Sequence, residues 1–286
     1  MTIKELLKEG SSFLGASDTS ILDLEVILAF VLGVERDYLI SHDDEEVDEA
    51  LVDLCNKYLN RVKDGEPVAH IINEKEFYGL SFFVDERVLI PRPETEHLVE
   101  EVLGFLRVLE QEDGFRLIDV GTGSGNIAVS IAKVFGDGGG LIDIDAVDIS
   151  EEALEVARVN AAQHAVEDRV RIYQSDLLEN IDDGEEFDVI VANLPYIGEV
   201  KHHFVSKEAE KYEPNVALFG GEDGLELYKK MFQQIKDKNV EFKLLLGEFG
   251  FAQGDDMRAL LNKYFEHKWE VKKDLAGIDR MFIVKF

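Results

Sequence analysis

The chain has 286 residues, of which 45% are hydrophobic, so it can bury a substantial core as one large domain or two smaller ones. Its 60 acidic and 30 basic side chains give a formal net charge of -30. This disfavours direct binding to nucleic acid, which relies largely on Lys and Arg. The acidic excess fits a solvated surface, a surface matched to a basic partner, or adaptation to salt. Cys55 is the single cysteine, which excludes an intrachain disulfide and a zinc site built on thiolates.

The start of the chain gives no sign of a targeting or membrane segment. "MTIKELLKEG" is charged and lacks the apolar stretch of a signal peptide. The apolar segment 21–34 is interrupted by Asp23 and Glu25 and is too short to span a bilayer. We therefore expect a cytoplasmic protein that makes no membrane contact, and we expect it to be a monomer.

The first part of the chain is expected to be helical. Apolar residues recur at helical spacing in three blocks, 3–14, 21–32 and 47–62, which predicts a small helical domain over residues 1–70. Residues 71–92 then alternate around a central "YGL", as the two strands of a hairpin do, and predict a β-hairpin linker.

The remainder, residues 93–286, is expected to form an α/β domain. Pro93 suits the first turn of a helix that runs to about residue 110. Apolar runs of strand length follow, and helices separate several of them, which favours a parallel sheet covered on both faces. The last two runs are close enough for an antiparallel hairpin. We predict a Rossmann-like, seven-stranded sheet whose last strand is antiparallel, with strands at 115–121, 141–150, 169–176, 187–196, 241–249, 268–275 and 280–286.

A glycine-rich turn follows the first strand of this sheet. Asp119 stands at the strand end, and Gly121, Gly123 and Gly125 lead into a helix, where the backbone must turn sharply and touch a ligand. Asn126 occupies the position where the dinucleotide fingerprint needs a third glycine, and the Gly-Lys-Ser/Thr end of a phosphate-binding loop is missing. Both NAD and ATP are therefore disfavoured.

Two further carboxylates stand at the ends of the next strands. Asp148 has the position of a carboxylate that binds a ribose diol, and Asp176 would lie beside an adenine. Because ligands bind at the carboxyl edge of such sheets, the features reinforce one another. Together they resemble the S-adenosylmethionine site of class I methyltransferases, with the candidate cofactor residues Asp119, Gly121, Thr122, Gly123, Ser124, Gly125, Asp148 and Asp176.

The fourth strand ends in "NLPY", residues 193–196. The side-chain oxygen of Asn193 and the main-chain carbonyl of Leu194 can each accept an N–H and direct a weakly nucleophilic nitrogen toward a methyl group. Pro195 stiffens the turn, and the ring of Tyr196 can pack on a planar substrate. This corner suits a glutamine amide and an adenine amino group equally.

Segments outside the corner carry a more specific resemblance. Residues 65–103 include "IPRPETE", residues 212–228 read "YEPNVALFGGEDGLELY", and "GEFGFAQ" and "GIDR" follow in order. These segments are similar to those of the PrmC/HemK family of release-factor glutamine methyltransferases. The resemblance covers nearly the whole chain, although the first 64 residues match in character more than in motif.

The resemblance implies methyl transfer from S-adenosylmethionine, giving S-adenosylhomocysteine, to N5 of the glutamine in the Gly-Gly-Gln loop of class I peptide chain release factors, without a metal. It implies that the helical domain, residues 1–70, recognises the substrate, and it adds Leu177 and Asn193 to the cofactor contacts. It assigns the substrate glutamine to Asn193, Leu194, Pro195 and Tyr196, and the region around its pocket to Arg92, Pro93, Glu94 and Thr95.

One residue departs from the family pattern, and two other functions stay open at this point. The family usually reads Asn-Pro-Pro-Tyr, and Leu194 replaces the first proline, so the carbonyl is kept and the fixed φ is lost. The first alternative is an N6-adenine methyltransferase acting on nucleic acid, which the net charge opposes. The second is a non-enzymatic, cofactor-binding regulatory module, which has no need of amide acceptors at the methyl group.

Overall fold

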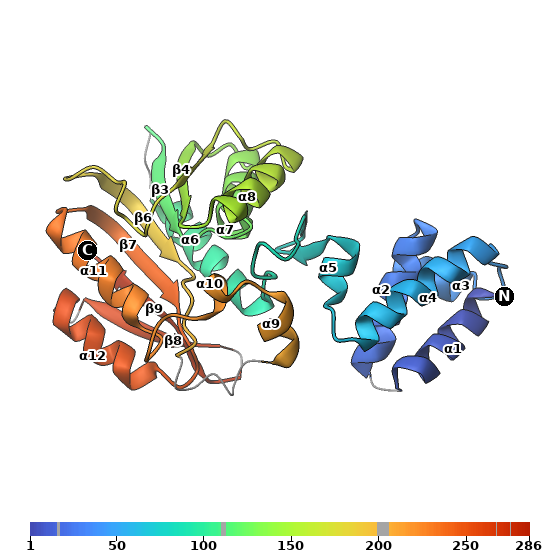
Figure 1. Ribbon diagram of the computed structural model, residues 1–286. Helices are drawn as coiled ribbons and strands as arrows, with labels where there is room; N and C mark the ends of the chain where they lie inside the picture. Colours follow the sequence, from blue (N-terminus) through green and yellow to red (C-terminus); the bar gives the residue numbers. More distant parts are fainter. Residues whose placement is uncertain (16–17, 110–112, 199–205, 267, 275) are drawn as a thin grey trace. The chain divides into compact units, whose positions relative to one another are not determined.

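The computed structural model describes residues 1–15, 18–109, 113–198, 206–266, 268–274 and 276–286 (Figure 1). The chain divides into two compact units. The first consists of Met1–Glu74 and Lys207–Tyr212, and the second of Lys75–Ser206 and Glu213–Phe286. Among the described residues, no helix has both the length and the apolar character needed to cross a membrane.

The first unit is helical, as its apolar spacing predicted. Its first helix begins with a capping box, in which the Thr2 hydroxyl accepts from the Glu5 amide and the Glu5 carboxylate accepts from the Thr2 amide. Leu24, Ile27 and Leu28 lie at the centre of its core. The helices are α1 (Ile3–Leu14), α2 (Asp18–Leu32), α3 (Arg36–Ser41), α4 (Glu49–Lys63) and α5 (Val68–Ile72).

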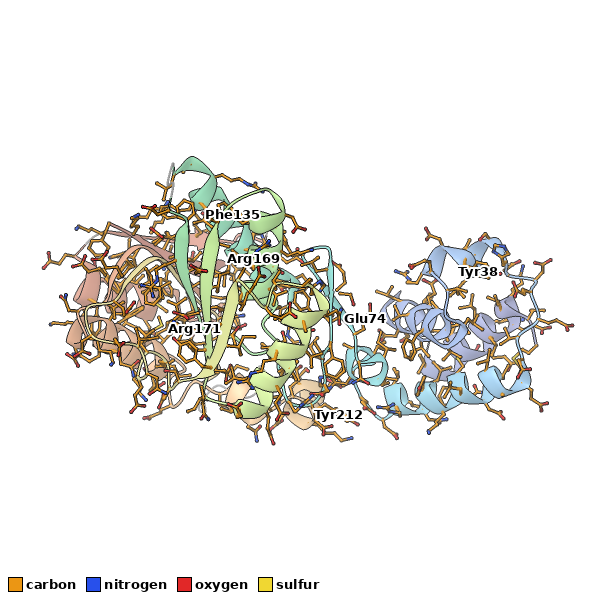
Figure 2. All side chains as sticks on the ribbon, turned by 90° about the horizontal axis from the view of Figure 1, so that it is seen from above. Tyr38, Glu74, Phe135, Arg169, Arg171 and Tyr212 are labelled. Atoms are coloured by element: carbon orange, nitrogen blue, oxygen red, sulfur yellow. The ribbon has the colours of Figure 1, made fainter. Side chains whose placement is uncertain are left out.

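A sixth helix, α9 (Lys207–Tyr212), also belongs to this unit. The Lys211 ammonium group and the Tyr212 hydroxyl each donate to the main-chain carbonyl of Asp64, at 3.3 Å (Tyr212 is labelled in Figure 2). The carbonyl belongs to the residue that caps the C-terminus of α4, where such groups need donors from outside the helix.

The second unit begins with a hairpin that is shorter than expected. β1 (Lys75–Phe77) pairs antiparallel with β2 (Leu80–Phe82) through a turn in which Tyr78 and Gly79 both have positive φ. Residues 71–72 end helix α5, and no strand is present between residue 83 and residue 92. The domain boundaries expected at residues 70 and 92 stay predictions.

The large sheet of this unit confirms the predicted fold. Its strand order is β5-β4-β3-β6-β7-β9-β8 (Figure 1), in which β5 to β7 run parallel and β9 runs antiparallel to both of its neighbours. All seven strands fall within the predicted segments or one residue outside them. They are β3 (Phe115–Val120), β4 (Ile142–Asp148), β5 (Val170–Gln174), β6 (Glu186–Ala192), β7 (Glu241–Glu248), β8 (Trp269–Lys273) and β9 (Asp279–Lys285).

Helices cover both faces of this sheet (Figure 1). Along β6, Val189 and Val191 pack into one hydrophobic cluster, and Ile190 and Ala192 into the other, as the alternation of a strand buried on both faces requires. The first cluster includes α6 (Glu96–Val108), α7 (Asn126–Asp137) and α8 (Glu151–Gln163), and the second includes α11 (Glu226–Asp237) and α12 (Gly254–Phe265). The carboxyl ends of β3, β4, β5 and β6 therefore share one edge.

Candidate active site

The loop after β3 needs its glycines for backbone conformation. Gly121, Gly123 and Gly125 have φ of 77°, 55° and 78°, a region that other residues rarely adopt. A Cβ on Gly121 would also lie 2.9 Å from the Leu194 side chain. The amides of Gly121 and Thr122 both donate to the Val147 carbonyl, at 2.8 and 2.9 Å, which fixes the loop to the end of β4.

Asp119 lies beneath this loop and is completely buried. The Thr122 hydroxyl donates to its Oδ2 at 2.7 Å, and the Ala128 amide donates to the same oxygen at 3.2 Å. Within the described part of the chain, its Oδ1 has no hydrogen-bond partner. Burial raises the pKa of Asp119 to about 7. The contacts of this carboxylate hold the glycine loop against α7, and its predicted cofactor role stays a prediction.

Asp148 and Asp176 stand near the same loop. Asp148 accepts from the Gly123 amide and from the Ser150 amide, each at 2.9 Å, and burial raises its pKa. Asp176 pairs with the Lys230 ammonium group of α11. Leu177 follows with a φ of 56°, a turn that carries the chain away from the end of β5.

The Asn-Leu-Pro-Tyr corner directly follows β6 and is tied to two distant segments. Asn193 Nδ2 donates to Thr95 Oγ1 at 3.0 Å, and Thr95 Oγ1 donates to Glu248 Oε2 at 2.7 Å. The Tyr196 hydroxyl donates to Glu248 Oε1 at 3.1 Å. Thr95 and Glu248 are both buried. This hydrogen-bonded chain links the end of β6, the start of α6 and the end of β7.

Arg92 is held by a different carboxylate. Its guanidinium donates to Glu213 Oε1 at 2.6 Å, and the Ile90 amide donates to Oε2 of the same residue at 3.2 Å. Glu213 is buried, so the pair ties the "PRPET" segment firmly to the "YEPN" segment. The two segments were singled out separately in the sequence, and the structure brings them together.

A cavity at the carboxyl edge of the sheet collects most of the predicted residues. Asp119, Gly125, Pro93, Glu94 and Tyr196 do not line it. The predicted residues that do line it are Arg92, Thr95, Gly121, Thr122, Gly123, Ser124, Asp148, Asp176, Leu177, Asn193, Leu194 and Pro195.

Sequence reasoning missed several residues of this region. Arg87, Ile149, Ser150 and Phe219 also line the cavity. Ile149 and Ser150 directly follow Asp148, so their position after a strand was a usable signal. Glu248 lay inside the "GEFGFAQ" segment without an assigned role, because its contact partner Thr95 is 153 residues away in the sequence.

Comparisons with known proteins agree with the fold. The family described as "Methyltransferase domain" matches residues 111–239, and the "PrmC N-terminal domain" family matches residues 5–72. The solved N-terminal domain of human METTL16 has a TM-score of 0.52 at 14% identity, covering 91% of this chain and 94% of that one. The sheet order and the methyltransferase match define a class I methyltransferase.

Curated relatives define the particular family. The release factor glutamine methyltransferase of Koribacter versatilis is 37% identical, with 99% of this chain and 98% of the relative covered. That of Bacillus subtilis is 39% identical, with 98% and 96% covered. The chain belongs to the release factor glutamine methyltransferase family.

Proposed function

We propose that this chain transfers a methyl group from S-adenosylmethionine to the side-chain amide nitrogen, N5, of the glutamine in the Gly-Gly-Gln loop of a class I peptide chain release factor. Family membership supports the glutamine of a release factor as the substrate. The single observation that carries the mechanism is the Asn193 corner, which lines the same cavity as the glycine loop and Asp148.

The residues at the glycine loop fit the methyl donor. Nothing lies within 4 Å of a Cβ built on Gly123, which leaves space for a ligand to approach the backbone, and the Asp148 carboxylate lines the same cavity, where it could bind a ribose diol. When bound, the sulfonium group supplies an already activated methyl.

The corner residues orient the acceptor nitrogen. Because the Asn193 Nδ2 end of the amide faces Thr95, to which it donates one N–H, Oδ1 lies at the opposite end and is the atom proposed to accept from a substrate. The Leu194 carbonyl supplies a second acceptor. Two acceptors match the two N–H groups of a glutamine amide, and they direct its lone pair toward the methyl carbon for in-line displacement. Water can take the proton as the new bond forms.

An adenine amino group also carries two N–H groups, so the corner alone does not separate the substrates. The net charge of -30 opposes a phosphate backbone, and it favours a basic protein partner. The names of the relatives, over nearly the full length of the chain, favour glutamine over adenine.

A substrate competition tests the proposal. The protein is incubated with S-adenosylmethionine and an equimolar mixture of a class I release factor and ribosomal RNA, and the methyl group is mapped by mass spectrometry. We expect it on the Gly-Gly-Gln glutamine, and we expect a release factor with that glutamine replaced by alanine to stay unmethylated. Methyl on adenine, with none on the glutamine, would contradict the proposal.

A further inference from the structure

The proposed chemistry gives no role to Glu248, a buried carboxylate that is hydrogen-bonded to the corner residue Tyr196. Glu248 ends β7, and its side chain is almost entirely excluded from solvent. It does not line the cavity next to Asn193. Burying a carboxylate is costly unless donors surround it, and here the hydroxyls of Thr95 and Tyr196 each donate to one of its oxygens.

The hydrogens available in the series of hydrogen bonds from Asn193 through Thr95 to Glu248 determine which way the Asn193 amide faces. An ionised carboxylate can only accept hydrogen bonds, and a threonine hydroxyl has a single hydrogen. Because Thr95 donates that hydrogen to Glu248, it can only accept from Asn193, and it therefore pairs with Nδ2. The reversed amide would set Asn193 Oδ1 against a hydroxyl oxygen that has no hydrogen left to give.

We propose that Glu248, acting through the Thr95 hydroxyl, is a positioning residue that fixes the orientation of the Asn193 amide and so presents Oδ1 to the substrate. The inference rests on the proposed function, and it adds to that function a residue that touches neither substrate nor cofactor. The Tyr196 hydroxyl holds the second carboxylate oxygen, so that Oε2 stays directed at Thr95.

Charged groups on the neighbouring elements set the titration of Glu248. Burial raises its pKa and Glu94 raises it further, while the Thr95 and Tyr196 hydrogen bonds and the Arg280 charge lower it. Two ion pairs lie nearby, Lys272 with Glu101 and Arg280 with Asp274, and within each pair the two charges partly neutralise one another. Glu248 lines a second, smaller cavity together with these groups, and the other titratable residues that line it are His97 and Lys273. The Tyr228 hydroxyl lies against the Glu248 main-chain carbonyl.

Protonation of Glu248 removes the constraint on Asn193. A protonated carboxyl can donate to Thr95, which can then give its own hydrogen to Asn193 Oδ1. The amide can turn over and present N–H groups to a substrate nitrogen that needs acceptors. We therefore expect kcat to fall on the acidic side as Glu248 takes up its proton, with a midpoint above the ordinary pKa of glutamate.

Three variants of the full chain test the hydroxyl. Thr95→Val removes both hydrogen bonds and is expected to lower kcat about tenfold or more, while the Kd for S-adenosylmethionine changes by less than about threefold. Thr95→Ser keeps the hydroxyl and should recover most of the rate. The matched control is Ser130→Ala, which removes a buried hydroxyl of α7 that has no partner in the described part of the chain. It should leave kcat unchanged.

Glu248→Gln tests the carboxylate through the pH profile. A glutamine side chain can both donate and accept, so Thr95 is no longer forced to donate at any pH. We expect a lower kcat at neutral pH and the loss of the acidic limb. Because the pKa of Glu248 is raised in the fold, the ionised form costs stability once the pH passes the unfolded pKa, and the variant should melt no lower than wild type at pH 8.

Two results would overturn the inference. One is a Glu248→Gln variant with the kcat and pH profile of wild type, and the other is a Thr95→Ser variant as slow as Thr95→Val. The test is separate from that of the proposed function, because the wild-type product identifies the substrate, whereas the ratio of variant to wild-type rates reports the positioning on whichever substrate is methylated.

Discussion

Leu194 stands where the family usually has a proline, and its backbone amide makes a hydrogen bond that helps to hold the corner in place. Its amide donates to the buried Tyr228 hydroxyl at 3.5 Å, a bond that a proline could not make. The same hydroxyl lies within hydrogen-bonding distance of the carbonyls of Ala192 and Glu248, the last residues of β6 and β7. Tyr228 therefore restrains the corner from below, which compensates in part for the φ that proline would fix.

A double-mutant cycle tests this compensation. Tyr228→Phe removes the hydroxyl in both the wild-type and the Leu194→Pro background, but only in the wild-type background does it also remove the hydrogen bond from the residue 194 amide, because proline has no N–H. We expect Tyr228→Phe to lower kcat more in the wild-type background, by a factor of about two to five, because the contacts with Ala192 and Glu248 cancel in the comparison. An equal fall in kcat in the two backgrounds would show that the hydrogen bond between the Leu194 amide and Tyr228 does not contribute to the rate.

The roles of single residues could be predicted only in part from the sequence. The glycines and Asp148 were found because they occupy fixed positions after strands, and the structure shows why the backbone needs those glycines. The partners of Arg92 and Thr95 could not be found, because Glu213 and Glu248 are more than a hundred residues away. Such contacts depend on strand order, which short sequence windows do not contain.

At the level of the elements, the start of α7 at Gly125 packs closely against helix α8. A Cβ on Gly125 would lie 3.2 Å from the Ala157 Cβ in α8 and 3.3 Å from its Cα. Gly139 has a similarly positive φ, 87° against 78°, with nothing within 4 Å of a Cβ. The two positions therefore separate backbone strain from steric clash.

We expect Gly139→Ala to destabilise the fold by about 1 kcal/mol through backbone strain alone. Gly125→Ala should cost about 1–3 kcal/mol more, because it also forces α7 and α8 apart. Urea unfolding of both variants measures the difference in the free energy of unfolding. Equal losses would mean that the contact between Gly125 and Ala157 is not a tight one.

Elements with a long apolar repeat were predicted well, and short ones were not. The strands of the large sheet have five to eight residues, and most of them are apolar runs with a recognisable end. Helices α3, α5, α9 and α10 (Asn215–Leu218) have four to six residues, which is too few to show a helical period. Residues 71 and 72 were assigned to the hairpin for the same reason, because two residues fit either period.

At the scale of the whole molecule, the division of the chain was only partly visible. The change from helical to strand spacing near residue 70 is a local signal, and the two units separate at Glu74. Lys207–Tyr212 belongs to the helical unit, where the Lys211 and Tyr212 side chains donate to the Asp64 carbonyl. The spacing of apolar residues does not predict such a contact.

The net charge of -30 leads to a prediction about salt. If a basic release factor is attracted by this charge, screening should weaken the encounter and leave the chemical step unchanged. We expect the KM for the release factor to rise at least about threefold between roughly 50 and 300 mM salt, with kcat constant within about twofold. A salt-independent KM would assign the acidic surface to solubility alone.

The proposed methyl transfer depends most on the corner at Asn193, and a single substitution tests its role most directly. Asn193→Ala is compared with wild type in two measurements: calorimetric binding of S-adenosylmethionine, and methylation of a release factor quantified by mass spectrometry of its Gly-Gly-Gln peptide. We predict nearly unchanged binding and a transfer rate lower by about a hundredfold or more, because the amide loses the acceptor that orients it. Transfer at the wild-type rate would contradict the role given to Asn193.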